Sequence, residues 1–63
     1  MLNSREFYMD LGREAAKARN QRDEARAEFH ARHFRAAKAL EQGEDRQIAD
    51  RLYMDAYAEE RRT

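Results

Sequence analysis

The amino-acid sequence predicts an all-α protein, and three of its properties lead to this fold class. Proline is absent and glycine occurs only twice. Charged residues make up 41% of the chain, and the commonest, arginine and glutamate, are good helix formers, as is the abundant alanine. Apolar residues recur every three or four positions from residue 7 to residue 40, which places them on one side of a helix. We therefore predict a single helical domain over residues 1–63.

The first predicted helix spans about residues 4–41. Asn3 followed by Glu6 is typical of a helix start with reciprocal capping, and residues 5–41 contain no strong stop signal. Gly12 costs about 1 kcal/mol relative to alanine, which a helix of this length tolerates. A stripe of ten residues keeps one angular phase along this segment, which favours an unbroken helix. Its members are Phe7, Leu11, Ala15, Ala18, Arg22, Ala25, Phe29, His33, Ala36 and Leu40.

A turn at Gly43 separates this helix from a second one, predicted over about residues 45–61. Gly43 suits the left-handed residue that ends a helix, and Asp45 suits the cap of the next one. The apolar face of the second helix consists of Ile48, Ala49, Leu52, Tyr53 and Ala56. The two helices together predict a helical hairpin with a long first arm.

A second interpretation breaks the first helix at residues 19–22 and gives a three-helix bundle. Asn20 would then cap a new helix whose first turn holds Asp23 and Glu24. The continuous stripe argues against this break, because an independent helix has no reason to keep the angular phase of the helix before it. The hairpin is therefore the favoured interpretation.

Small size makes self-association the expected state. Of the apolar residues in this 63-residue chain, 12 are alanine, which leaves 14 larger side chains to build a core. Burial of each contributes roughly 1.5 to 3 kcal/mol, against about 1.5 kcal/mol of ordering entropy per residue, so a lone monomer is expected to be marginal. A hairpin that reverses at Gly43 also leaves residues 5 to about 22 uncovered. We therefore predict a homodimer in the form of an antiparallel helical bundle.

Two surfaces are predicted to make protein contacts. The first, an interface with a second copy or another partner, joins the stripe to the face of the second helix. It consists of Phe7, Tyr8, Leu11, Ala15, Ala18, Arg22, Ala25, Phe29, His33, Ala36, Leu40, Ile48, Leu52, Tyr53 and Ala56. The second is a docking surface of Phe34, Met54 and Tyr57, because aromatic and methionine side chains supply adaptable contact area.

Nucleic-acid binding is the main alternative, because residues 13–38 hold eight basic and four acidic residues. The candidate phosphate contacts are Arg13, Lys17, Arg19, Arg26, Arg35 and Lys38. By helical angle these side chains fall on two flanks and form no single stripe. The formal net charge of the chain is zero, so long-range attraction to a polyanion is small. Protein binding is therefore the favoured function.

Catalytic and metal-binding motifs are weak in this sequence. Cysteine is absent, which excludes disulfides and thiol chemistry. His30 and His33 are spaced to share one helix face, but no third ligand joins them at helical spacing, so we predict no metal site. No nucleophile with a base beside it and no glycine-rich phosphate loop is present. The expectation is a non-enzymatic protein without cofactor or small-molecule substrate, located in the cytoplasm and not bound to membrane.

The chain as a whole, from FYMDLGREAAKARNQRDEARAEFHARHFRAAKALEQ to DRQIADRLYMDAYAEERR, resembles a small early-region protein of lambdoid bacteriophages. The corresponding gene lies between the exonuclease and excisionase genes. This resemblance implies a non-enzymatic helical protein that is expressed early and acts in host takeover or in the balance between lytic growth and lysogeny. The implied partner is an unidentified host or phage protein, and the implied location is the host cytoplasm.

Overall fold

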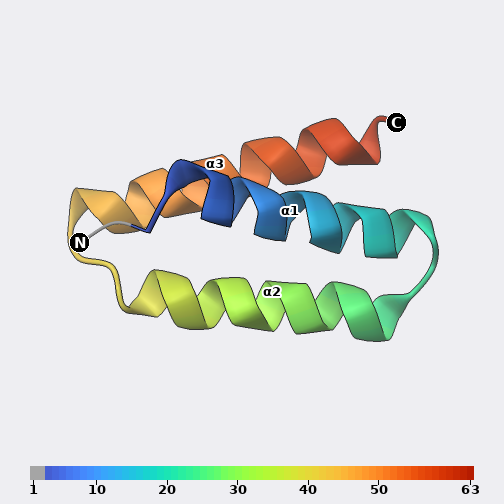
Figure 1. Ribbon diagram of the computed structural model, residues 1–63, viewed down its shortest axis with the longest axis horizontal. Coiled ribbons are helices and arrows are strands. Elements are labelled where there is room, and N and C mark those ends of the chain that lie inside the picture. Colours follow the sequence, from blue (N-terminus) through green and yellow to red (C-terminus); the bar gives the residue numbers. More distant parts are fainter. Residues whose placement is uncertain (1–2) are drawn as a thin grey trace.

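The computed structural model describes residues 3–63 and contains three α-helices in this range. They are α1 (Arg5–Asn20), α2 (Glu24–Ala39) and α3 (Glu44–Arg61), and they lie side by side along one long axis (Figure 1). The predicted all-α class is confirmed. The predicted unbroken helix over residues 4–41 is wrong, because the chain turns at residues 21–23. The second interpretation, three helices with a break near Asn20, agrees with the structure.

Helix α1 ends in a C-terminal motif whose usual glycine is absent from the sequence. The backbone N–H of Asp23 donates to the carbonyl oxygen of Ala18 (2.8 Å), and that of Arg22 donates to Arg19 (3.0 Å). This pair of bonds defines a Schellman motif, whose residue after the cap takes a left-handed conformation and is usually glycine. Here that residue is Arg22, with φ of 60°. An arginine at this position gives no sequence signal for the end of a helix.

Side-chain caps begin α1 and α2 at positions other than those predicted. The hydroxyl of Ser4 accepts a hydrogen bond from the backbone N–H of Phe7 (3.1 Å), so Ser4, and not Asn3, caps α1. The carboxylate of Asp23 accepts from the backbone N–H of Arg26 (3.1 Å), so Asp23 caps α2. Asn20, the cap expected in the three-helix interpretation, is the last residue of α1.

The turn predicted at Gly43 is present, with one difference in detail. Gly43 has φ of 51° and ψ of −126°, a conformation that glycine adopts far more readily than other residues. It is the residue that precedes α3, so Asp45 lies in the first turn of that helix and does not cap it. An acidic first turn with Glu44 and Asp45 interacts favourably with the helix dipole.

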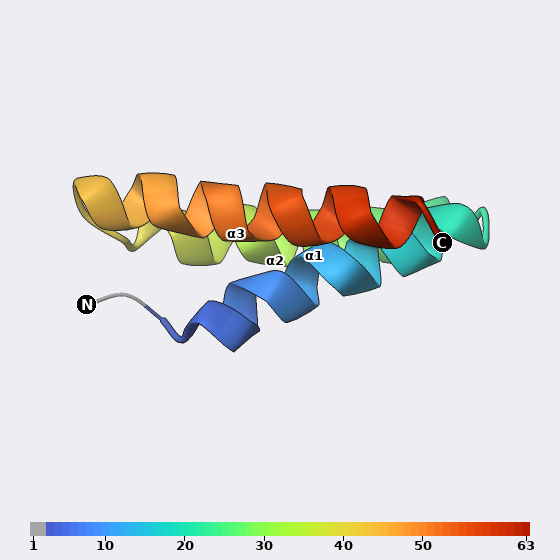
Figure 2. The same cartoon turned by 90° about the horizontal axis from the view of Figure 1, so that it is seen from above.

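Helix α1 packs against both α2 and α3, whereas the backbones of α2 and α3 are farther apart and these two helices meet through side chains. Its first turns lean away from α3, as the second view shows (Figure 2). The segment predicted to be uncovered, residues 5–22, is therefore covered by the chain's own α2 and α3. A dimer is therefore not needed to cover the first arm, contrary to the prediction.

The core is small and contains two aromatic pairs. The ring of Phe34 on α2 stacks on that of Tyr53 on α3, with centroids 3.9 Å apart, and meets the ring of Tyr8 edge-on at 6.0 Å. Such arrangements add stabilisation beyond the burial of area. The buried core cluster consists of Tyr8, Leu11, Ala15, Phe34, Ala37, Ala49 and Tyr53.

Gly12 allows α1 and α3 to approach closely. A Cβ atom placed on Gly12 would collide with the backbone carbonyl oxygen of Tyr53 and lie 3.2 Å from the backbone nitrogen of Tyr57. Only a residue without a side chain fits this crossing. The glycine read from the sequence as a weak point of a long helix is therefore a packing requirement of the bundle.

Candidate protein-binding surface

Helix α2 has apolar residues on two opposite sides, and only one of these sides faces the core. Ala27, Phe34 and Ala37 are buried, and Phe34 contacts Tyr8 of α1 and Tyr53 of α3. On the other side, Ala25, Phe29, Ala36 and the C-cap residue Leu40 are all exposed, and we call these four residues the outer face of α2. Phe29 is 62% exposed and Leu40 is 79% exposed. The bundle thus closes its core while it leaves two large apolar side chains on this one face in water.

Phe29 is the centre of a row of aromatic and imidazole rings on this surface. Its ring lies 5.3 Å from that of His30 and 6.4 Å from that of His33, measured between centroids. His33 in turn meets Phe7 of α1 edge-on at 5.8 Å. These contacts orient the Phe29 side chain although most of its surface is exposed. An ordered aromatic side chain loses little conformational entropy when it binds a partner.

Unpaired arginines surround the outer face of α2. Arg22, Arg26 and Arg32 are exposed and take part in none of the ion pairs found within residues 3–63. By helical angle, Arg26 lies on one flank of Phe29 and Arg32 lies on the other. The surface therefore combines an apolar centre with arginines that form no close ion pair with the chain's own acids.

Most of the predicted nucleic-acid contacts are, in contrast, already paired with acids. Arg19 contacts Glu24 (2.8 Å), Arg35 contacts Glu28 (2.7 Å) and Lys38 contacts Asp50 (3.0 Å), measured between nitrogen and oxygen. Lys17 contacts Glu14, and Arg13 contacts Asp10 and Glu6. Of the six candidates, Arg26 alone is outside these pairs. The structure does not assemble the six cations into one surface for phosphate groups.

The predicted interface is divided by the turn at residues 21–23. Six members of the predicted interface, on α1 and α3, are buried inside the bundle. They are Tyr8, Leu11, Ala15, Ala18, Tyr53 and Ala56. Phe7 and Leu52 are half-buried. The members that remain exposed are Arg22, Ala25, Phe29, His33, Ala36, Leu40 and Ile48. Only this exposed group is available for contact with another molecule.

The predicted second docking surface is not formed, because its largest member is buried. Phe34 is only 4% exposed and belongs to the core, where it stacks on Tyr53. Met54 is 53% exposed on α3, and Tyr57 is half-buried with its ring 6.1 Å from that of Tyr53. Phe34, Met54 and Tyr57 therefore do not form one surface.

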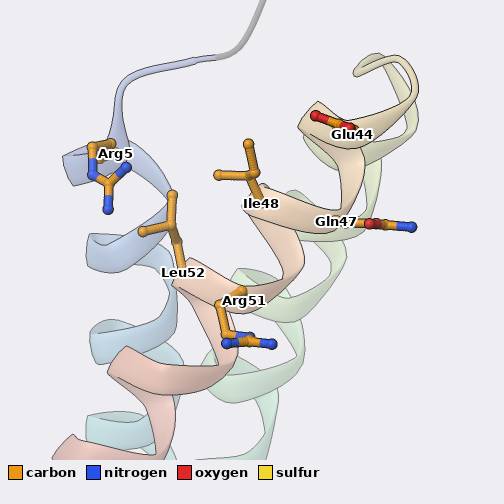
Figure 3. A pocket seen from close by; sticks show the side chains of 6 residues that line it. All are labelled: Arg5, Glu44, Gln47, Ile48, Arg51 and Leu52. Carbon is orange, nitrogen blue, oxygen red and sulfur yellow. The ribbon is translucent and has the colours of Figure 1, made fainter.

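A groove with a volume of about 430 Å³ lies between the starts of α1 and α3. Ile48 and Leu52 of α3 point toward the first turn of α1, where Arg5 lies (Figure 3). Glu44, Gln47 and Arg51 complete the lining, so that the rim carries both signs of charge. A mixed rim gives no preference for a ligand of one charge.

Glu41 and Tyr8 form a buried polar contact that no sequence pattern indicated. Glu41 is 1% exposed, and its Oε2 accepts hydrogen bonds from the Tyr8 hydroxyl and from the backbone N–H of Asn3 (2.9 Å). The Tyr8 hydrogen bond, followed by that from Asn3, lowers the pKa of Glu41. Burial, followed by the hydrogen bond to Glu41, raises the pKa of Tyr8. Both pKa values move away from neutrality, which is unfavourable for acid–base catalysis near pH 7.

Two further observations concern metals and membranes. Among residues 3–63, no group of three or more histidine or acidic side chains is arranged to hold a metal ion. None of the helices in this range has both the length and the apolar character needed to cross a membrane.

These features define the class of protein: a small all-helical bundle with an exposed apolar and basic helix face. Comparison with known proteins found no matching family model, no matching curated protein and no matching solved structure. The function is therefore inferred from the surface itself.

Proposed function

We propose that this chain is a non-enzymatic protein-interaction module whose binding surface is the outer face of α2. The proposed occupant is an amphipathic helix of a second polypeptide. The observation that carries this proposal is the exposure of Phe29 and Leu40, 62% and 79%, in a bundle whose core is closed without them. Exposed apolar side chains that share one face are typical of interaction sites.

The dimensions and the small residues of this face suit a helix. Phe29 and Leu40 are eleven residues apart, which corresponds to about 16 Å, or three helical turns, along the axis. Ala25 and Ala36 have small side chains, which allow a partner helix to approach more closely than large side chains do. A partner helix with apolar side chains in its centre would bury Phe29 and Leu40 at once.

Direct binding of DNA or RNA is the competing proposal, supported by the unpaired guanidinium groups of Arg22, Arg26 and Arg32. The apolar side chains between these arginines offer nothing to a phosphate backbone, and they lose the benefit of burial in such a complex. Protein binding uses both properties of the surface, because acidic side chains that flank an apolar stripe can pair with the arginines.

The resemblance to early-region proteins of lambdoid bacteriophages extends this proposal. On that basis we place the protein in the host cytoplasm and assign it a host or phage protein as its target, with a role in regulation or host takeover. The physical proposal about α2 does not depend on this assignment.

A labelled probe peptide tests the proposed function. The probe is a 16-residue amphipathic helix with a leucine stripe and glutamate flanks, and its control carries a central proline that breaks the helix. We expect fluorescence anisotropy to detect saturable binding of the probe, no binding of the control, and a loss of at least about tenfold in affinity for the variant Phe29→Ser.

The same titration with a random-sequence DNA duplex separates the two proposals. We expect no saturable binding of duplex at about 0.1 M salt. Failure of the helical probe to bind, together with duplex binding that weakens steeply with salt and on Arg26→Ala, would refute the protein-binding proposal in favour of nucleic acid.

A further inference from the structure

We infer that the helix that occupies the outer face of α2 is α2 of a second copy of this chain, in antiparallel orientation. The two-fold axis of the pair passes between Arg32 and His33. This inference rests on the proposed function, since it names the partner for the same surface. It follows from the order of large and small side chains along α2 and from the charges at its two ends.

Large and small side chains on the outer face are arranged symmetrically about the proposed axis. Phe29 and Ala36 are equally far from the point between Arg32 and His33, and Ala25 and Leu40 are also equally far from it. An antiparallel partner therefore places Phe29 opposite the partner's Ala36, and Leu40 opposite the partner's Ala25. Each large exposed side chain meets a small one, as close packing of two helices requires.

The charges at the two ends of α2 are complementary in the same orientation. The turn before α2 carries the exposed Arg22, and Arg26 follows in the first turn of the helix, with Asp23 between them. Helix α3 begins with Glu44, which also lines the groove beside α1, and with Asp45, and Arg46 follows them. Within residues 3–63 these side chains take part in no ion pair. Antiparallel pairing brings the basic end of one copy near the acidic end of the other, and two-fold symmetry repeats this contact. A parallel pair would place like charges together at both ends.

The centre of the pair is polar and carries like charge, because Arg32 and His33 of both copies lie beside the axis and the two Arg32 side chains repel each other. Polar residues in a helix seam lower affinity and fix the register of the two helices. One helix face per copy is also a small interface, so we expect a weak dimer with a dissociation constant in the micromolar range.

Sedimentation of the whole chain tests the pairing. We expect the weight-average mass to rise from monomer to dimer over about 1 to 1000 µM, and Phe29→Ser to weaken the dimer by at least about tenfold. The matched control is Met54→Ser, which removes a side chain of similar exposure, 53%, from α3 and should leave the dimer unchanged. Equal effects of both variants would overturn the assignment to α2.

Cysteine crosslinking tests the orientation, because the native chain has no cysteine. In the antiparallel pair, Arg32→Cys should crosslink to its own copy through a short bismaleimide. Ala25→Cys should not, because the two copies of residue 25 would lie fifteen residues apart along the pair, about 22 Å. Crosslinking of both variants would indicate a parallel pair and would overturn the inference.

The outcomes separate this inference from the proposed function. A chain that remains monomeric up to about 1 mM refutes self-pairing, but the proposed function stands if the helical probe peptide still binds α2. If the chain is monomeric and the probe peptide does not bind, both proposals fail.

Discussion

Replacement of Phe34 by alanine is expected to lower the free energy of unfolding by about 3 to 5 kcal/mol. Phe34 is 4% exposed and stacks on Tyr53, so its loss leaves a cavity between α2 and α3. A chain of 63 residues has a total stability of only about 3 to 9 kcal/mol, so this change removes about a third or more of it. Urea denaturation followed by circular dichroism measures the change.

Phe29→Ala is the matched control for this prediction. It removes the same side chain from the same helix, but at a position that is 62% exposed, so its cost should stay below about 1 kcal/mol. The comparison reports which side of α2 faces the core. If Phe29→Ala were the severe variant and Phe34→Ala the mild one, α2 would be rotated about its axis and the proposed binding face would be part of the core.

Replacement of Gly12 by alanine is the second change with a large expected effect. In an exposed helix this substitution stabilises by about 1 kcal/mol, because alanine has the higher helix propensity. Here the added Cβ would collide with the backbone carbonyl oxygen of Tyr53, so α3 must shift away from α1. We expect a net loss of about 1 to 3 kcal/mol or more in urea denaturation.

The sign of the Gly12 effect is the informative result. Ala36→Gly, at an exposed position of α2, makes the reverse exchange without a packing partner and should cost only about 1 kcal/mol. If Gly12→Ala instead raised the stability by a similar amount, α1 and α3 would not be in close backbone contact, and the arrangement of the bundle would need revision.

The sequence allowed the helical class and the turn at Gly43 to be predicted, because glycine and the polar residues around it give a local signal. The turn after α1 gave no such signal, since Arg22 occupies the left-handed position of its Schellman motif. The signal in this segment lies in the start of the next helix, where Asp23 caps α2 and Glu24 follows in its first turn. This signal is weaker than the continuous stripe, so the sequence favours the unbroken helix over the three helices of the structure.

The stripe was misleading because its two halves have different roles in the structure. Leu11, Ala15 and Ala18 face the core, whereas Phe29 and Leu40 keep the same helical phase but point to solvent after the turn. A constant phase thus arises from two independent helices. Burial on the opposite side of α2, around Phe34, depends on tertiary packing that periodicity alone does not reveal.

Part of the candidate surface could still be predicted from the sequence. Ala25, Phe29, His33, Ala36 and Leu40 were assigned to a contact surface from their spacing, and the structure leaves all five exposed. The pairing of most lysines and arginines with nearby acids could not be predicted, because it depends on which helix faces meet. The unpaired state of Arg22, Arg26 and Arg32 became visible only in the folded chain.

The central claim, that the outer face of α2 is the contact surface, is tested most directly by nuclear magnetic resonance of the amide groups. A dilution series from about 1 mM to about 10 µM should shift the amides of Ala25, Phe29 and Ala36, and leave those of Leu11 and Ile48 unchanged. Addition of the helical probe peptide to the dilute sample should move the same three amides. Shifts centred on Ile48 and the groove between α1 and α3, or no shifts in either experiment, would contradict the account.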